Sequence, residues 1–492
     1  MWRVTLIFAF ISLTMAVDKS VIIIGSGISG YSAASKLLEN GFNDVIILEA
    51  EDRIGGRINT IPYDDGFIDL GAQWVHGQQG NIIYEMAHKH FDFGITPFDD
   101  VPFTFLLSNG TKPNQELINA ISKLCFEIDH KIYTGDTFTG SFGDMFIDIY
   151  DGIVANGSSP LFKDLDPIII KMMKETSERN INGYAAIKSW FDLSAKLCAR
   201  EELAQGSQHN TWRRKGFKTI FDFISKKLPD PSQHIDIESK VQLNKKVTNI
   251  KYNINDVNNK AVITCADGSA YEAKHVIFTP SLGVLKKYHE SLFTPALPEQ
   301  KVLAIKLYGF GAAGKIFLEF DESFWIEEGE PFVAYQFLWL DADKEEVKAA
   351  NRQWMLGISA FYMVDEFPNM LEAYLGGPNI EEFEASSDDK IIDDCVWAFE
   401  KFLGKTLPRP KAMIKTNWLT NENFLGAYSY PSMNAEKAGV GIKELAEYIN
   451  NNDGKPILLF AGSAMDEKYP GNTHAGVRTG FRAAHEIISI YQ

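Results

Sequence analysis

A short apolar strand that runs directly into a glycine-rich turn constrains this chain more than any other feature. Residues 21–24 (VIII) are all β-branched, which is typical of a strand buried on both faces. The turn contains three glycines at the spacing GxGxxG, namely Gly25, Gly27 and Gly30. A helical pattern follows, and a second apolar run at 45–48 ends in Glu49. Such a turn lets a pyrophosphate approach a helix N-terminus, and the acid can accept ribose hydroxyl protons, so we predict a dinucleotide-binding βαβ unit.

Length and composition exclude several other classes of protein. The chain has 492 residues, 45% hydrophobic and 12% aromatic, which is enough apolar material for a large core and too much for a disordered chain. A formal net charge of −17 disfavours nucleic acid as a partner, because phosphate contacts need a basic surface. Four scattered cysteines indicate neither a zinc site nor a disulfide framework, although an oxidising compartment would allow one or two disulfides: Cys125, Cys198, Cys265 and Cys395.

The first residues, 1–16, are typical of a secretory signal peptide. Arg3 supplies a positive start, an apolar run follows at 4–13, and residues 14–16 (TMA) offer a cleavage site. The apolar run is too short for a membrane span, which needs about 20 residues, and a buried first strand is the alternative interpretation. Glycosylation sequons at Asn109 and Asn156 fit a secreted glycoprotein. We therefore expect an extracellular protein without a membrane anchor.

Nucleotide-type signals recur in the middle of the chain and near its end. Strand-like runs flank the Asp267-Gly268 turn, and a last apolar strand at 456–460 precedes Gly462. Helix-rich and mixed segments separate these signals. We predict two interleaved domains: a nucleotide domain from 18–95, 236–305 and 421–492, and a substrate domain from 96–235 and 306–420.

The motif RIGGR at 53–57 follows the ribose acid and places two cations beside the expected diphosphate. On these residues the chain resembles the flavin-containing amine oxidases, a family that includes polyamine and monoamine oxidases. The resemblance covers nearly the whole chain after residue 16. It implies an α/β fold, with a Rossmann-like FAD-binding domain interleaved with an α+β substrate domain. It also implies that Glu49 and Arg57 contact FAD.

Two central motifs extend the resemblance to the reacting centre. The motif GAQWVHG is similar to the family segment beneath the isoalloxazine ring, which implies that Gln73 and Trp74 contact the cofactor and that His76 faces the substrate. The motif GFGAAGKIFLEF places Lys315 at the start of a strand. In the family, a lysine at this position holds a water beside flavin N5, so Lys315 is the expected catalytic residue.

The same resemblance assigns further cofactor contacts in the second half of the chain: Val247, Trp418, Gly462, Ser463 and Thr473. The family usually has an acid at the position of Ser463, and this departure weakens the expected contacts to the ribityl chain. In monoamine oxidases a cysteine tethers the flavin in the segment that here contains Tyr428. No cysteine lies in that segment, so non-covalent FAD is expected.

The substrate residues that the resemblance implies are fewer. Tyr428 is expected to form one aromatic wall of the amine channel, with Tyr430 as the alternative. Asn472 occupies a position that is small and polar in animal polyamine oxidases. Glu202 matches the second of two glutamates in animal spermine oxidases, whereas the first falls near Ala199, so cation recognition is altered or shared by other acids.

The resemblance implies an FAD-dependent polyamine oxidase acting on spermine, spermidine or acetylated forms. A neutral amine would transfer hydride to flavin N5, water would hydrolyse the imine, and O2 would regenerate FAD with release of hydrogen peroxide. One alternative is a secreted L-amino-acid oxidase, which needs an arginine in the channel to pair with the substrate carboxylate. The adjacent residues Arg213 and Arg214 are the candidates in the substrate domain. The other is a secreted flavoprotein that has lost catalysis, as Ser463 and the missing glutamate suggest. The sequence leaves open the physiological amine and the oligomeric state.

Secretion can be tested directly. Cells that express the full chain are expected to release a protein that starts near Val17, because the signal peptide is removed on export. N-terminal sequencing of the medium and of the cytosol measures this. An intact Met1 in cytosolic protein would contradict the prediction.

Overall fold

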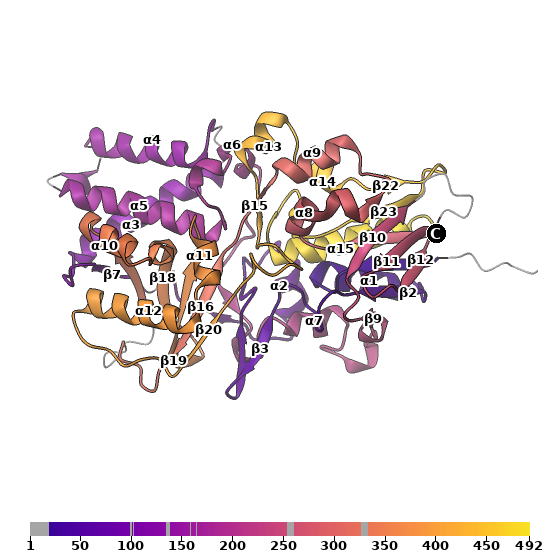
Figure 1. Ribbon diagram of the computed structural model, residues 1–492, viewed down its shortest axis with the longest axis horizontal. Coiled ribbons are helices and arrows are strands. Elements are labelled where there is room, and N and C mark those ends of the chain that lie inside the picture. The colour runs from indigo at the N-terminus through magenta and orange to yellow at the C-terminus, as the bar shows by residue number, and fades with distance from the viewer. Residues whose placement is uncertain are drawn as a thin grey trace, which may run out of the picture.

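Two six-stranded sheets organise the structure, a computed structural model that describes residues 19–98, 101, 103–133, 138–157, 159–163, 165–252, 260–325 and 333–492. One sheet belongs to the right half of Figure 1 and the other to the left half. The predicted signal peptide lies outside the described residues. Within those residues, no helix combines the length and the apolar character that a bilayer crossing requires.

The first sheet is built around the strand that precedes the glycine turn. Its strands, in spatial order, are β22 (Ile449–Asn450), β23 (Pro456–Phe460), β13 (His275–Phe278), β1 (Val21–Ile24), β2 (Val45–Leu48) and β9 (Val241–Gln242). β1 pairs in parallel with β2 and β13, so that Val21 lies opposite Val45 and His275. Every residue of β1 is buried, which explains why its sequence is apolar throughout instead of alternating. Segments far apart in the chain are thus neighbouring strands.

Two helices pack against each other beside this sheet, α1 (Ile28–Glu39) and α15 (Thr473–Ile488). Glycines of α15 permit the close approach: a Cβ at Gly480 would lie 2.2 Å from the Ser29 carbonyl oxygen. A Cβ at Gly476 would lie 2.6 Å from Cγ2 of Ile28. The N-terminal turns of the two helices therefore lie side by side, although one begins the chain's nucleotide fold and the other ends it.

The second sheet belongs to the other half of the molecule. Its order is β20 (Ala412–Lys415), β16 (Gly314–Glu319), β19 (Phe367–Leu375), β18 (Ile358–Val364), β17 (Ala334–Leu338) and β7 (Thr104–Leu107). All neighbours are antiparallel except β17 and β7. A core of large side chains joins this sheet to α12 (Asp388–Leu403), with the rings of Phe337 and Phe402 stacked at 3.9 Å. Every residue of β17 is buried.

The remaining elements complete the two halves. A four-stranded sheet has the order β12 (Ala270–Ala273), β11 (Ala261–Cys265), β10 (Val247–Tyr252) and β14 (Phe293–Thr294). The other helices are α2 (Ile82–Ala87), α3 (Gln115–His130), α4 (Phe142–Ala155), α5 (Pro167–Tyr184), α6 (Ala195–Cys198), α7 (Thr219–Ile224), α8 (Leu282–Leu292), α9 (Glu299–Leu307), α10 (Asp341–Ala349), α11 (Ile380–Ala385), α13 (Met433–Ala438) and α14 (Ile442–Ala446). The strand order requires interleaved segments, while the exact domain boundaries stay predictions.

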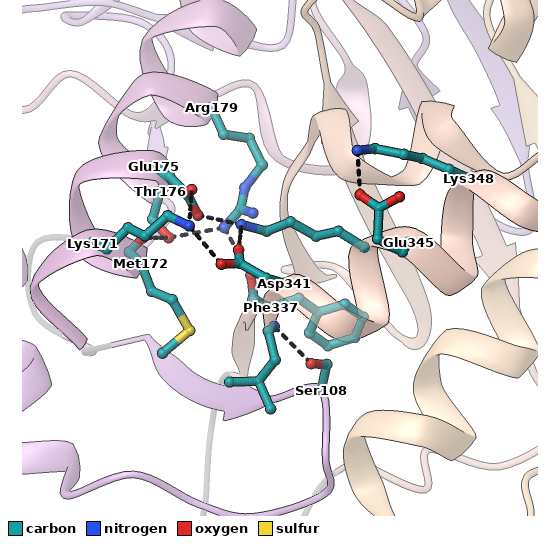
Figure 2. Close-up of polar contacts among 12 residues, drawn as sticks. Ser108, Lys171, Met172, Glu175, Thr176, Arg179, Phe337, Asp341, Glu345 and Lys348 are labelled. Atoms are coloured by element: carbon teal, nitrogen blue, oxygen red, sulfur yellow. Dashed lines mark hydrogen bonds and ion pairs between the residues drawn. The ribbon is translucent and has the colours of Figure 1, made fainter. Parts of the chain in front are cut away.

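Helix α5 is tied to the second sheet and to α10 by the polar contacts of Figure 2. Arg179 donates a 2.8 Å hydrogen bond to the carbonyl oxygen of Phe337 on β17. Lys171 forms an ion pair with Asp341 at 2.6 Å, at the start of α10. The exposed pair contributes little to stability, whereas the buried guanidinium fixes the helix against a strand. These contacts hold α5 in place as a wall of the cavity described below.

The glycine turn gives a prediction about stability. A Cβ at Gly30 would lie 2.0 Å from the carbonyl oxygen of Gly25, so Gly30→Ala is expected to lower the melting temperature by about 5 °C or more. Gly152→Ala on α4 is the control, because nothing lies within 4 Å of its Cβ position and alanine favours a helix. Thermal unfolding monitored by circular dichroism compares the two variants, and equal melting temperatures would contradict the prediction.

Candidate functional site

A cavity of about 1450 Å³ extends from the glycine turn into the helices of the other half. Most of the predicted site residues line it: Gly25, Gly27, Glu49, Arg57, Gln73, Trp74, His76, Val247, Lys315, Trp418, Tyr428, Gly462, Ser463, Asn472 and Thr473. Gly30 and Glu202 are not on its wall. Gly30 lies beneath the turn, where it allows α1 to approach Gly25. The fold therefore assembles residues from both halves around one space.

The glycine turn and the acid after β2 form one end of the cavity. Gly25 has φ +95°, and a Cβ there would lie 2.6 Å from Oγ1 of Thr279, so the turn requires glycine. The amide and the hydroxyl of Ser26 both donate 2.7 Å hydrogen bonds to Oε2 of Glu49. This fixes the carboxylate above the turn, and its oxygens keep lone pairs that can accept ribose hydroxyl protons. α1 begins at Gly27 without a side-chain cap, so its first amides remain available to an anion.

Arg57 supplies the observation that most directly identifies the ligand at this end. Its guanidinium lines the cavity, and the described residues provide it with no hydrogen-bond or ion-pair partner, while the ring of Phe310 lies 5.8 Å away. Burial lowers the pKa of Arg57 to about 10, which still leaves it cationic at neutral pH. A half-buried, unpaired guanidinium beside an uncapped helix N-terminus fits a diphosphate. The residues present therefore fit a dinucleotide cofactor.

The start of α15 faces the same space. Its N-cap residue Asn472 makes no side-chain cap bond, and Asn472, Thr473 and Gly476 line the cavity. The side chain of Asn472 donates instead to the carbonyl oxygen of Pro470 at 3.4 Å. Because the N-terminal turns of α15 and α1 are neighbours, two positive helix ends converge on the cofactor end of the cavity.

Lys315 lies at the start of β16 and is only 5% exposed. Its Nζ donates to the carbonyl oxygen of Asp69 at 3.0 Å and to Oε1 of Gln73, and it lies 3.2 Å from Oε1 of Glu372. The Trp74 ring is 5.7 Å away. An ammonium in this setting can donate a proton to, or stabilise negative charge on, a group held in the cavity.

His76 is half-buried and faces the same cavity. Its Nδ1 lies 2.7 Å from the carbonyl oxygen of Gln208, and the ring of His209 lies 6.4 Å from its own ring. Burial lowers the pKa of His76, and burial together with His76 lowers that of His209 to about 4. Both imidazoles are therefore neutral near pH 7, so they do not repel a cation.

Aromatic side chains line the middle of the cavity. The predicted Tyr428 is joined by Tyr374, with their hydroxyl oxygens 3.2 Å apart, and Tyr430 lines the cavity as well. Tyr362 and Trp74 stand across from one another with ring centroids 6.0 Å apart. Sequence reasoning missed Tyr362 and Tyr374. No local pattern marks either residue: Tyr374 faces the site because β19 pairs with β16 opposite Lys315, and Tyr362 lies on β18, opposite Glu372 of β19.

Glu202 differs from its expected position. It is 51% exposed and pairs with Lys468 at 2.7 Å, outside the cavity wall. Its neighbour Glu201 lines the cavity instead. A second acid that the sequence did not single out, Asp129 on α3, also lines the cavity. Ala199, at the C-terminus of α6, carries no charge there.

The four cysteines are free and buried, so none forms a disulfide. Cys125 and Cys198 line the cavity, close to Asp129 and Glu201 and not in the segment of Tyr428. Burial raises the pKa of Cys125 to about 12 and that of Cys198 well above the usual range, which keeps both thiols protonated and weakly nucleophilic. No group of acidic, histidine or cysteine side chains in the described ranges could hold a metal ion.

Comparisons with known proteins agree with this geometry. The sequence profile of the family described as flavin containing amine oxidoreductase matches residues 28–145 and 172–488. The chain is 27% identical to the protein anon-37Cs of Drosophila melanogaster, across 96% of this chain and 91% of the relative. It is 26% identical to the peroxisomal N(1)-acetyl-spermine/spermidine oxidase of Bos taurus, across 96% and 95% respectively.

A plant relative and a solved structure extend the comparison. Polyamine oxidase 1 of Zea mays is 25% identical over 98% of this chain and 92% of its own length. A putrescine oxidase double mutant, made in a redesign of cofactor binding, matches with a TM-score of 0.67 and 17% identity, across 96% of this chain and 99% of that structure. This likeness confirms the predicted α/β fold class.

The position of the cysteines gives a test of how the flavin is held. Since both cavity thiols are protonated and lie outside the Tyr428 segment, the flavin is expected to be bound without a covalent link. Acid precipitation of the purified holoprotein should leave the yellow colour in the supernatant, measured by absorbance. Flavin that stays in the washed pellet would contradict this expectation.

Proposed function

The chain belongs to the flavin-containing amine oxidoreductase family, and from this premise we propose that it oxidises polyamines with FAD as its cofactor. The family implies an amine substrate and a flavin. The names of several relatives support the narrower substrate class, since they are oxidases of acetylated spermine and spermidine, of polyamines, or of putrescine. These substrates carry more than one nitrogen along a flexible chain. A cavity that binds them must therefore offer partners for ammonium groups away from the reacting nitrogen.

FAD supplies a two-electron acceptor when it is bound at the Arg57 end of the cavity. The diphosphate would be held by Arg57 and the N-terminus of α1, and the ribose by Glu49. Lys315 lies deeper, where its ammonium can hold a proton beside the reacting atoms. The aromatic side chains around Trp74 and Tyr428 exclude water there and can hold an amine by its cation or its C–H face.

The observation that carries the polyamine proposal is a pair of half-buried carboxyls on the cavity wall that lack cationic partners. Glu201 lines the cavity without a hydrogen-bond or ion-pair partner for its side chain among the described residues, and burial alone raises its pKa to about 8. Asp129 also lines the cavity, its Oδ1 is buried without a partner, and burial raises its pKa well above the usual range. A charged carboxylate in such a place costs several kcal/mol unless a cation pairs with it.

These carboxyls complement a ligand with ammonium groups remote from the reacting nitrogen. An ammonium beside Glu201 or Asp129 would ionise the acid and form a charge-assisted hydrogen bond. His76 and His209 are neutral near pH 7 and add no positive charge to the cavity wall. A polyamine can therefore place its distal cations against the acids while one neutral nitrogen reaches the Lys315 region.

The L-amino-acid oxidase alternative requires a cation for the substrate carboxylate. Among the described residues on the cavity wall, Arg57 is the only arginine, and it lies at the cofactor end. Arg213 and Arg214 lie off the wall and form ion pairs with Asp92 and Asp65 respectively. The acids at the other end cannot pair with a carboxylate as an arginine would, so this alternative has less support.

Secretion is part of the proposal as well. Asn109 and Asn156 are both exposed, which supports their use as glycosylation sites.

The alternative of a flavoprotein without catalysis is less well supported. Ser463 lines the cavity in the place of the family's acid, but Lys315 and Arg57 line the cavity as well. These retained groups favour an active oxidase over a flavoprotein without catalysis.

The paired glutamates allow a matched test of the substrate. Glu201→Gln is expected to raise KM for spermine about tenfold or more and to change kcat less, because a distal ammonium loses its buried counter-ion. Glu202→Gln, one residue away and exposed, is expected to change KM less than about twofold. Peroxide release with spermine, spermidine, acetylated polyamines, benzylamine and L-leucine measures both variants and the wild type.

The pH dependence provides a second reading of the same variants. Only ionised Glu201 pairs with an ammonium, and its pKa is raised to about 8, so the wild-type KM should fall as the pH rises towards 8. Glu201→Gln should lose that trend. If benzylamine or L-leucine is oxidised faster than every polyamine, the substrate proposal is wrong. If Glu202→Gln raises KM and Glu201→Gln does not, the assignment of the acid is wrong.

A further inference from the structure

Lys315 is one member of a buried cluster whose other two side chains are Gln73 and Glu372. The Nε2 of Gln73 donates a 2.9 Å hydrogen bond to Oε2 of Glu372, while its Oε1 accepts a hydrogen bond from Lys315. Glu372 Oε1 lies 3.2 Å from Lys315 Nζ. The amide of Gln73 therefore bridges a cation and an anion and can be oriented in only one way.

The strand register explains why these residues meet. Lys315 on β16 lies opposite Tyr374 on β19, and Phe317 lies opposite Glu372. Positions 315 and 317 are on one face of β16, so Lys315 and Glu372 are diagonal neighbours on the same face of the sheet. A lysine and a glutamate can span such a diagonal. The pairing depends on two strands that are far apart in the chain, β16 (Gly314–Glu319) and β19 (Phe367–Leu375).

Glu372 differs from Lys315 in its access to the cavity. Lys315 and Gln73 line the cavity, whereas Glu372 is 0% exposed and lies behind them, off the wall. Lys315 is the only cation that forms an ion pair with Glu372 among the described residues. Glu372 therefore cannot touch a ligand in the cavity, and it can act there only through Lys315 and Gln73.

The other ionisable groups around this pair are uncharged or turned away. The carboxylate of Asp69 accepts hydrogen bonds from the Phe217 amide at 3.0 Å, and only its carbonyl oxygen meets Lys315. Asp365 accepts a 2.7 Å hydrogen bond from Thr96. The remaining neighbours are the phenols of Tyr362 and Tyr374, which burial keeps protonated by raising their pKa well above the usual range. Glu372 is thus the counter-ion in direct contact with the ammonium.

We propose that Glu372 is a positioning residue that keeps Lys315 charged and, together with Gln73, directs its ammonium at the reacting face of the cavity. The proposal deepens the proposed function, since it concerns the same reaction, but it requires only that Lys315 faces the bound flavin. Without Glu372, the lysine would be a buried cation without a counter-ion and would lose its proton more readily. The cavity would then lose a positive charge at the site of reaction.

A double-mutant cycle tests this coupling. Glu372→Gln keeps the shape of the side chain and is expected to slow flavin reduction or reoxidation about tenfold, with the Lys315 limb of the pH profile moved to lower pH. Lys315→Met is expected to slow the same step about 100-fold. Glu372→Gln added to Lys315→Met should change the rate less than about twofold, because the counter-ion then has no cation to serve. Stopped-flow absorbance at several pH values measures each variant.

A matched control separates this role from a general loss of packing. Glu384 is a buried carboxylate on α11 that accepts hydrogen bonds from Leu419 and Thr420 and does not contact Lys315. Glu384→Gln is expected to lower stability without moving the pH profile. Independent effects of Glu372→Gln and Lys315→Met on the rate, or an unshifted pH profile in Glu372→Gln, would overturn the proposal.

Thermal unfolding gives a readout that needs no turnover. Each single variant leaves one buried charge unpaired, whereas the double variant removes both charges. The melting temperature of the double variant should therefore fall by less than the sum of the decreases in the two single variants. If Glu372→Gln does not fold by itself, the double variant should still fold and retain flavin. Strictly additive losses would overturn the coupling. Any amine that reduces the flavin can be used to measure these rates. The test of Glu372 therefore does not depend on the substrate being a polyamine, and failure of one proposal can be told apart from failure of the other.

Discussion

Ionisable groups without protein partners inside the cavity are the constraint on which the rest of this structure depends. At one end Arg57 and two uncapped helix N-termini present positive charge, and at the other end Glu201 and Asp129 present half-buried carboxyls. Burying such groups is costly, and a ligand of opposite charge removes much of that cost. The cavity is therefore polar in a definite direction, with an anion favoured at the nucleotide fold and a cation favoured among the helices.

The interleaved topology holds this arrangement in place. The nucleotide sheet combines strands from three separated segments, and the second sheet likewise draws its strands from distant parts of the chain. The wall near Gln73 comes from the first third of the sequence, that near Lys315 from the middle, and that near Tyr428 and Thr473 from the end. No segment could form the cavity alone. Cofactor binding and folding of both halves are consequently coupled, since a ligand at the junction stabilises the assembled state.

Between the two charged ends the cavity wall is nearly neutral. His76 and His209 lose their charge through burial, and Lys315 is balanced by Glu372 behind it. Rings of Trp74 and Tyr428 line this stretch as well. A neutral, aromatic stretch suits a reaction in which the nitrogen must be uncharged when its carbon is oxidised, because it does not favour the ammonium form as strongly as an unpaired carboxylate would.

Local features of the chain were determined by the sequence alone. The strand, the glycine turn and Glu49 are close in sequence. The spacing of the glycines and the run of apolar residues can therefore be recognised within one short segment. The family motifs likewise placed Gln73, Trp74 and Lys315 on the cavity wall. Tertiary structure decided what depends on pairing between distant strands and on the direction of single side chains. Strand register brought Tyr374 and Glu372 beside Lys315, and the turn after α6 pointed Glu201 inward while Glu202 faces solvent. A one-residue shift in either place would reverse which side chain faces the site, and no local pattern in the chain specifies that choice.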